Sequence, residues 1–405
     1  MMESNEITNI LKVGDNKAFQ KGLSKLNDIY NSNLENYEGL PSDYLQKVLR
    51  AIEQRHNIKK YTSNYSEVLI EHTSKLSANS LPSIKWNGLV FLLISNGLFK
   101  VAHVARTKGI ESATYNSFGE SFNNTSIHSL KAFADQGDLK SAKEIIARIK
   151  KNDFDKSLLD RWKIFHTILK GDKKQATILC EPNFSKADRT FFNYISGKRV
   201  AIVGPAPVKE DFSKEINSFD VVIRFNYKGG LPKNGFGNRI DVSYYNGGTA
   251  NYLNSNDTYF LNDVKFSCFK SIRYQYQKDK ISTQEGRAFF PLPAEFLFSG
   301  SPNALPNVLF DILHFNPKYI KVFHCNLYLT NTPHYQGYQL KKREKNSFWQ
   351  AFAVHELITQ FNFLKNIWKV KLFEPDKTLE AVLKLTPEKY METMEKIYVY
   401  PFLMK

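Results

Sequence analysis

Two histidines in the second half of the chain are the side chains best suited to acid–base chemistry. His334 lies in the polar loop 331–338, and His355 lies in a segment with helical spacing. Imidazole changes its charge near neutral pH, so it can take a proton from a hydroxyl group or give one to a leaving group. His314 and His324 stand among apolar residues and are expected to be structural. We therefore select His355 and His334 as catalytic candidates, with a surface or structural role as the alternative for each.

A small polar turn, Ser299-Gly300-Ser301, comes before a helical pattern at 304–314. Hydroxyl groups and free backbone N–H groups at the start of a helix can bind phosphate. An ordinary helix N-cap would use the same residue types. The turn is thus a candidate phosphate site, with capping as the alternative.

Three apolar runs, each typical of a buried strand, end in a turn or a polar side chain. These are Arg199–Val203 before Gly204-Pro205-Ala206-Pro207, Val221–Ile223 leading to Asn226, and Asp241–Tyr245 before Asn246. The carboxyl ends of parallel strands meet at one edge of a sheet, where nucleotides bind in α/β proteins. Three ordinary strands would explain the apolar runs but not the polar residues after them. The pattern therefore predicts a nucleotide site at these strand ends.

The sequence argues against several classes of nucleotide-dependent protein. The turn at Gly204 supplies one of the three glycines of a dinucleotide fingerprint, and no GxxxxGK[ST] loop occurs. The sole Asp-x-Asp pair, Asp153-Phe154-Asp155, lies in the first half of the chain. A sugar diphosphate donor typically needs a metal ion to neutralise its leaving group. A sugar on a nucleoside monophosphate leaves with less charge, which hydroxyls, imidazolium or helix N-termini can stabilise. We therefore expect no metal and no bound cofactor.

The chain divides into two predicted domains, an α-helical one over 1–190 and an α/β one over 191–405. The motif Gly-Asp begins at Gly137 and again at Gly171, 34 residues apart, which is the period of a tetratricopeptide repeat. An irregular helical domain with related packing is the alternative. From residue 199 strands and helices alternate, which indicates an α/β fold. A helix is expected over 347–368 and a last strand over 369–373.

Composition bounds the partners and the compartment. The 405 residues include 56 basic and 40 acidic ones, a formal net charge of +16, which favours anionic substrates, polyanions or anionic membrane surfaces. Three cysteines without ligand spacing indicate a reducing compartment. No signal-peptide pattern is visible at the start, and the longest apolar run, 88–99, is too short to span a bilayer. We expect a cytoplasmic protein, with attachment to the inner face of the membrane by charge as a further expectation. Nucleic acid is not expected as a partner, because no RNP, helix-turn-helix or zinc signature occurs.

Together, the motifs of the second half resemble the sialyltransferases of glycosyltransferase family 29. The matching segments are 204–226 and 237–242 for the large motif, Ser299–Phe323 for the small motif, His334-Tyr335 for motif three, and His355 with Gln360 for the very small motif. The likeness covers roughly residues 197 to 370. A fainter likeness to family 42 lies in Tyr245-Asn246 and Tyr335-Gln336-Gly337.

The resemblance implies a GT-A-like, Rossmann-type transferase domain after a tetratricopeptide-like helical domain. The reaction would be inverting and metal-independent, moving sialic acid from CMP-sialic acid to a glycan hydroxyl in surface polysaccharide or lipooligosaccharide synthesis. His355 would be the general base, and His334 with Ser299 and Gly300 would stabilise the departing CMP phosphate. The other donor-binding positions that it implies are Gly204, Pro205, Ala206, Asn226, Asn246, Ser301, Tyr328 and Tyr335. A glycan or lipid-linked oligosaccharide would be the acceptor.

The chain departs from the family at three points. Pro205 stands where the family usually has Asn, Gln360 replaces the usual Glu, and the disulfide of animal members has no counterpart. In the family 42 pattern the base would fall at Tyr338, so the family 29 assignment to His355 is preferred. Two alternatives stay open: transfer of Kdo or another ulosonic acid from its CMP form, and a helical interaction protein with an inactive transferase-like domain. The helical domain would bind a protein partner in the second case.

Overall fold

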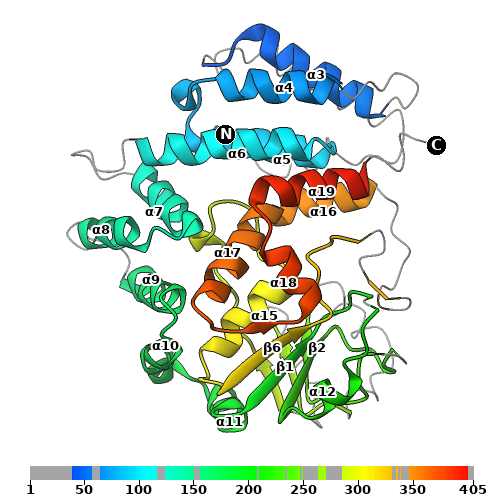
Figure 1. Cartoon of the computed structure of the whole chain (residues 1–405). Helices are drawn as coiled ribbons and strands as arrows, with labels where there is room; N and C mark the ends of the chain where they lie inside the picture. The colour runs from blue at the N-terminus through cyan, green and yellow to red at the C-terminus, as the bar shows by residue number, and fades with distance from the viewer. Residues whose placement is uncertain are drawn as a thin grey trace.

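The computed structural model describes residues 39–56, 64–115, 124–149, 156–207, 209–232, 235–246, 249, 263–270, 285–330, 334, 335, 338 and 346–399. Within these residues, helices from the first half of the chain stack above one end of a parallel sheet and continue down one side of it (Figure 1). The helices of the first half are α3 (Ser42–His56), α4 (Asn64–Lys75), α5 (Ser83–Ser95), α6 (Phe99–Tyr115), α7 (Asn124–Gln136), α8 (Leu139–Ile149), α9 (Lys156–Leu169), α10 (Lys173–Cys180) and α11 (Lys186–Ile195).

The described strands form one parallel sheet in the order β5-β4-β3-β2-β1-β6-β7. Their bounds are β1 (Arg199–Val203), β2 (Val221–Phe225), β3 (Val242–Tyr245), β4 (Phe266–Phe269), β5 (Glu285–Ala288), β6 (Tyr319–Phe323) and β7 (Glu374–Pro375). Val200 of β1 pairs with Val221 on one side and with Ile320 on the other. Strands covered on both faces favour continuous apolar runs, which is why the predicted strands were visible in the sequence. The α/β prediction is confirmed.

The helices of the second half pack around the sheet and reach up to the helices of the first half. They are α12 (Ser213–Asn217), α15 (Ala304–Leu313), α16 (Asn346–His355), α17 (Leu357–Lys369), α18 (Lys377–Leu383) and α19 (Pro387–Tyr398). Two sequence-based expectations need correction here. The single helix predicted over 347–368 is two helices, because the backbone of Glu356 is left-handed with φ of 42°. The strand predicted over 369–373 is absent from that position, since α17 runs to Lys369 and β7 follows at Glu374.

The repeated Gly-Asp motif marks two helical hairpins of the same kind, α7–α8 and α9–α10. Gly137 and Gly171 have φ of 77° and 85°, a left-handed conformation that glycine adopts at little cost at the end of a helix. Asp138 then accepts a hydrogen bond from the amide of Ser141 at 3.1 Å, and Asp172 accepts one from the amide of Gln175 at 2.9 Å. The repeat is therefore a repeated turn between helices. A tetratricopeptide architecture stays a prediction.

The two halves of the chain share one hydrophobic core. A single cluster of buried side chains runs from Leu40 to Val399. Helix α16 packs on α5, α17 on α7 and α19 on α6, so the C-terminal helices lie between the upper helices and the sheet (Figure 1). The predicted domain boundary at residues 190 and 191 falls inside α11.

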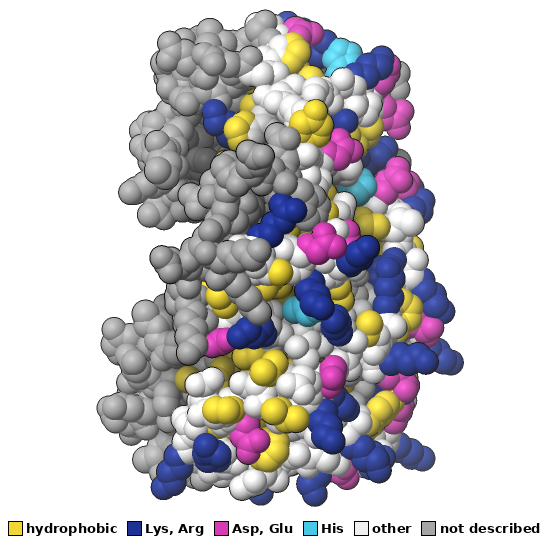
Figure 2. Space-filling model, turned by 90° about the vertical axis from the view of Figure 1, so that its left-hand side faces the viewer, with side chains coloured by type: hydrophobic (Ala, Val, Ile, Leu, Met, Phe, Trp, Pro, Cys, Tyr) yellow, Lys and Arg dark blue, Asp and Glu magenta, His cyan; other side chains and the backbone are white. Residues whose placement is uncertain are grey.

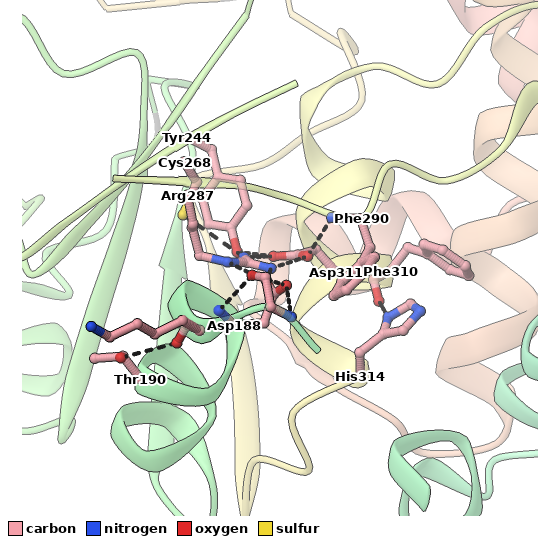
Figure 3. A network of polar contacts seen from close by, with 11 residues as sticks. Asp188, Thr190, Tyr244, Cys268, Arg287, Phe290, Phe310, Asp311 and His314 are labelled. Carbon is pink, nitrogen blue, oxygen red and sulfur yellow. Dashed lines mark hydrogen bonds and ion pairs between the residues drawn. The ribbon is translucent and has the colours of Figure 1, made fainter. Parts of the chain in front are cut away.

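A buried ion cluster ties the edge strand β5 to helices α11 and α15 (Figure 3). The guanidinium group of Arg287 donates to Asp188 of α11 at 2.8 Å and to Asp311 of α15 at 2.6 Å. Asp311 also accepts from the hydroxyl of Tyr244 in β3 and from the amide of Phe290 at 2.7 Å. Each polar group of this cluster is therefore paired inside the core, as burial requires.

The surface beside α8, α9 and α10 carries more Lys and Arg than Asp and Glu side chains (Figure 2). This distribution agrees with the net charge of +16. In the part of the chain that the structure describes, no helix combines the length and the apolar character needed to cross a bilayer.

Candidate functional site

A cavity of about 670 Å³ opens at the carboxyl edge of the sheet. Its lining comes from the segments that follow β1, β2, β3, β4, β5 and β6, from the start of α15 and from α16. Five strand spacings separate β5 from β6, so the lining segments span roughly 24 Å of the sheet edge, at about 4.8 Å per spacing. The chain reverses direction across the sheet between β1 and β6, the point at which α/β folds bind ligands.

The turns after β1 and β6 meet at this reversal. The amide of Gly204 donates to the carbonyl oxygen of Phe323 at 2.8 Å, and that of Ala206 donates to the carbonyl oxygen of His324 at 2.9 Å. A Cβ atom on Gly204 would lie 2.3 Å from Sγ of Cys325, so only glycine fits. Gly204 is thus a packing residue behind the cavity, whereas Pro205 and Ala206 line it.

Asn226 organises the strand ends next to this turn. Its backbone is left-handed with φ of 52°, a conformation that asparagine tolerates. Its Oδ1 accepts from the amide of Asn246 at 2.9 Å, and its Nδ2 donates to the hydroxyl of Tyr338 at 2.8 Å. Asn246 in turn accepts from the amide of Thr249 at 2.8 Å. Asn226 and Asn246 both line the cavity as the sequence predicted, and their side chains also position their neighbours.

His355 lies at the end of α16 with its imidazole in the cavity wall. Its Nδ1 is 2.9 Å from the carbonyl oxygen of Ser301, and a carbonyl can only accept, so Nδ1 carries the proton. In the neutral form of the ring, the lone pair is therefore on Nε2. A hydrogen bond of this kind holds the ring in one orientation and makes Nε2 the basic atom.

The loop Ser299-Gly300-Ser301 supports this histidine through its backbone. The amide of Ser301 donates to the carbonyl oxygen of Val354 at 3.0 Å. Gly300 has φ of 74°, and a Cβ there would meet the carbonyl oxygen of His355 at 2.6 Å. The three residues do not line the cavity among the described wall residues, whereas Pro302 and Asn303 do. Ser299, Gly300 and Ser301 were predicted to contact a phosphate. In the structure they stand behind the cavity wall, and the residues that follow them, Pro302 and Asn303, form it.

Gln360 holds the same loop from the other side. Its Nε2 donates to the carbonyl oxygens of His355 at 2.8 Å and Ser301 at 3.3 Å, and its Oε1 accepts from the amide of Asn303 at 3.1 Å. A carboxylate could accept from Asn303 but could not donate to two carbonyls. The departure from Glu at this position therefore fits the hydrogen bonds that the loop requires.

His334 stacks on Tyr338 with ring centroids 4.9 Å apart and meets Tyr328 edge-on at 6.2 Å. All three rings line the cavity. Tyr335 does not: its amide donates to the carbonyl oxygen of Pro205 at 2.8 Å, and its ring packs against Phe236. Gln336 and Gly337, part of the fainter family 42 likeness, lie outside the described residues.

The turn that carries Tyr328 is strained. Leu327 and Tyr328 have φ of 46° and 70°, which is uncommon for residues other than glycine. Hydroxyl groups of α19 hold the turn: Tyr390 donates to the carbonyl oxygen of Leu327 and Tyr398 to that of Tyr328, each at 2.9 Å. Strain that surrounding structure enforces concentrates at functional sites.

The described wall of the cavity contains cationic and neutral polar side chains and no carboxylate. Lys228 and Lys270, which the sequence analysis did not select, belong to this wall. Burial lowers the pKa of both, and a nearby anion would offset that shift by favouring the charged form. No acidic group contributes to either shift. The position of Lys228, two residues beyond the predicted Asn226, was the signal that could have identified it.

His324, expected to be structural, also lines the cavity. Its ring stacks on Phe236 at 3.8 Å, and its Nε2 lies 2.9 Å from the carbonyl oxygen of Gly235. Burial lowers its pKa to about 4, so the ring is neutral at pH 7. In the described structure one buried polar atom of the wall, Oδ1 of Asn303, has no hydrogen-bond partner, whereas the ring of His324 lies near the backbone of Ala206 and the hydroxyl of Tyr245 near Ser243 and Ser267. Such atoms are expected where a polar ligand binds.

The chain was compared with protein-family models, with curated proteins and with solved structures, and none of these comparisons found a match. The likeness to family 29 therefore depends on its four motifs and stays a prediction. Among the described residues, no three His, Cys, Asp or Glu side chains come together as a metal site would require. The expectation of metal-independent chemistry is left to experiment.

Proposed function

We propose that this protein is an inverting, metal-independent glycosyltransferase that moves sialic acid from CMP-sialic acid to a glycan hydroxyl. The observation that carries the proposal is the cavity at the reversal of the sheet, whose described wall has two lysines, oriented histidines and no carboxylate. CMP-sialic acid carries two negative charges, one on its phosphodiester and one on its sugar carboxylate. Lys228 and Lys270 would balance them.

The phosphate is best placed at the start of α15. Pro302, Asn303, Ala304 and Leu305 form this part of the wall. The side chain of the N-cap residue Asn303 makes no capping hydrogen bond, so it leaves the amides of Ala304 and Leu305 to a ligand, while Pro306 has no N–H group. The N-terminus of a helix favours an anion by its dipole and its free amides. Together with His334 and Tyr328, this helix end would stabilise the CMP that departs.

His355 is the proposed general base. The acceptor hydroxyl attacks the anomeric carbon as the bond to the phosphate oxygen breaks, its proton moves to Nε2 of His355, and CMP leaves with the bonding electrons. With no carboxylate in the described wall, imidazole is the wall group best matched to this task at neutral pH. His334 is the second candidate, because its ring also faces the cavity.

The general type of fold is also compatible with a glycosyltransferase. A parallel sheet with a ligand cavity at its reversal is Rossmann-type, and we propose that it is GT-A-like. The basic face beside α8–α10 (Figure 2) would bring the enzyme to an anionic membrane surface that holds a lipid-linked acceptor. Surface polysaccharide or lipooligosaccharide synthesis would supply such an acceptor.

The first experiment is a thermal-shift titration of the full chain with CMP, CDP, UDP and NAD, without added metal. We expect CMP to raise the melting temperature and UDP and NAD to leave it unchanged. Both donors, CMP-sialic acid and CMP-Kdo, carry the same charges, so CMP binding cannot distinguish them. Their rates of turnover would show which sugar the enzyme transfers. A shift with UDP or NAD but not CMP would overturn the proposal. No shift with any of them would favour the interaction protein.

A variant separates chemistry from binding. His355→Ala should reduce transfer by about 10² to 10⁴-fold, the usual contribution of a general base, and should leave the CMP-induced shift unchanged. The matched control is His334→Ala, which should weaken CMP and slow transfer less. Residual transfer near the wild-type rate in His355→Ala would move the base to another residue. Loss of activity in EDTA would contradict the metal-independent mechanism.

A further inference from the structure

A buried arginine of the helical half lies against the turn that follows His355. Arg106 is in the middle of α6, 3% exposed. Its Nε donates to Oε2 of Glu356 at 2.9 Å, and its Nη2 donates to Thr359 at 2.8 Å and to Asp135 of α7 at 2.7 Å. Helices of the first half therefore contact the first residues after the candidate base directly.

Glu356 is the residue that separates α16 from α17. Its left-handed backbone, with φ of 42°, ends α16 at His355 and lets the chain turn into α17. Its carboxylate caps α17 by accepting from the amides of Ile358 and Thr359, each at 3.1 Å. The side chain is almost fully buried, so its negative charge depends on the cation of Arg106.

The same guanidinium group also contacts the loop on the other side of the imidazole. Its carbon Cζ lies 5.2 Å from the ring centroid of Phe298. Phe298 directly precedes the loop whose Ser301 carbonyl accepts from Nδ1 of His355. Arg106 thus touches both segments that hold the histidine, the turn at Glu356 and the approach to Ser301.

We infer that Arg106 is a positioning residue for His355, and that the helical half is a structural part of the active site. The inference rests on the proposed role of His355. Without Arg106, the carboxylates of Glu356 and Asp135 would be buried together without their shared cation. The turn would relax, and Nε2 of His355 would leave the orientation in which it can accept a proton. A displacement of about 1 Å can cost roughly 10²-fold in rate.

A second buried arginine provides a matched control. Arg55 of α3 forms an ion pair with Glu395 of α19, and both side chains are at most 1% exposed. This pair also joins the helical half to the C-terminal helices. Neither Arg55 nor Glu395 contacts the loop at Ser301 or the turn at Glu356 in any described hydrogen bond, so the loss of this pair tests stability without altering the segments that hold His355.

The experiment compares Arg106→Met and Arg55→Met in the full chain, with Arg106→Lys and the milder Thr359→Val as second variants. Each is assayed by urea unfolding, by CMP affinity, by kcat and KM, and by the Cε1–H proton resonance of His355 at fixed pH. That resonance is assigned by its loss in His355→Ala. The NMR measurement needs no substrate, so it tests the positioning role even if the transferase assignment fails.

We expect Arg106→Met to lower kcat by about 10 to 100-fold, with CMP affinity within about twofold, and to shift the His355 resonance. Arg106→Lys should have a higher kcat than Arg106→Met, because lysine keeps the positive charge but lacks the planar guanidinium group that donates to several acceptors at once. Arg55→Met should lower stability and leave the His355 resonance unchanged. A wild-type His355 resonance in Arg106→Met, or an equal shift of that resonance in Arg55→Met, would overturn the inference. If Arg106→Met does not fold, the same criteria apply to Thr359→Val.

Discussion

Arg106 in the helical half and Arg287 in the sheet are each buried between two carboxylates. Arg106 bridges Asp135 and Glu356, and Arg287 bridges Asp188 and Asp311 (Figure 3). The charges are alike, but the backbones that carry the carboxylates are not. Asp188 and Asp311 belong to helices beneath the sheet, whereas Glu356 forms the strained turn beside His355.

The surroundings of Arg287 are those of a structural cluster. Its guanidinium carbon lies 4.4 Å from the ring centroid of Phe191 and 4.8 Å from that of Phe315. Asp188 also closes the capping box of α11 with Ser185. The comparison teaches that the charges alone do not distinguish a functional ion pair from a structural one. In our proposal the difference is the position of the carboxylate: Glu356 ends the helix that carries His355, whereas Asp188 and Asp311 lie within helices away from it.

The largest effect that we predict is on stability, in Arg287→Met. The variant leaves two buried carboxylates without their cation, and removal of one partner from a buried ion pair usually costs about 3–5 kcal/mol of unfolding free energy. Urea unfolding at pH 7 measures this loss. The kcat of the folded fraction should stay at the wild-type value. A loss below about 1 kcal/mol would mean that the cluster is not what holds β5 in place.

The second prediction compares a histidine from each half. Burial lowers the pKa of His103 in α6 and of His324 in the cavity wall to about 4. An unfolded chain has the ordinary value of about 6.5, so between pH 6.5 and 4 it binds protons that the folded chain does not. The unfolding free energy should therefore fall as pH falls through this window, by up to about 3 kcal/mol for each histidine.

Urea unfolding of the wild type, His103→Gln and His324→Gln at pH 7, 6 and 5 tests this prediction. Each variant should lose part of the pH dependence. Saturation with CMP should reduce the acid sensitivity that remains in His103→Gln, since His324 lines the cavity in which we propose that CMP binds. The prediction is wrong if the wild type is equally stable at pH 7 and pH 5.

The smallest effect separates two neighbouring tyrosines of β3 that both line the cavity. The hydroxyl of Tyr244 donates to the charged Asp311 in the Arg287 cluster, whereas that of Tyr245 has only the neutral hydroxyl groups of Ser243 and Ser267 nearby. Tyr244→Phe should cost about 2 kcal/mol, the usual range for a hydrogen bond to a charged group, and leave CMP affinity unchanged. Tyr245→Phe should keep stability and weaken CMP. The reverse pattern in unfolding and binding assays would place the ligand elsewhere.

Much of the sheet could be predicted because its strands are local signals. β1 and β6 begin and end where the apolar runs 199–203 and 319–323 begin and end. The residues that follow β1, β2 and β3 were predicted to meet, and Pro205, Ala206, Asn226 and Asn246 do line one cavity. The two histidines selected as catalytic candidates, His334 and His355, also lie in the wall of this cavity.

Other features of the site had no local signal. Residues 347–368 have continuous helical spacing, and the carboxylate at the break, that of Glu356, pairs with Arg106, which is 250 residues away in the chain. Ser299-Gly300-Ser301 has the residue types of a phosphate loop, but its backbone is used to hold His355. The lysines of the wall were missed because isolated lysines beyond a strand end resemble ordinary surface residues.

The sequence by itself determined that the segments of β1, β2 and β3 are buried strands and which polar residues follow them, because burial on both faces selects apolar runs. Tertiary structure decided the order of the strands, and with it the reversal between β1 and β6 where the cavity lies. It also decided which nitrogen of His355 is basic, since that depends on the carbonyl of Ser301, 54 residues earlier. Contacts between distant residues carry no periodic pattern, so only the folded chain reveals them.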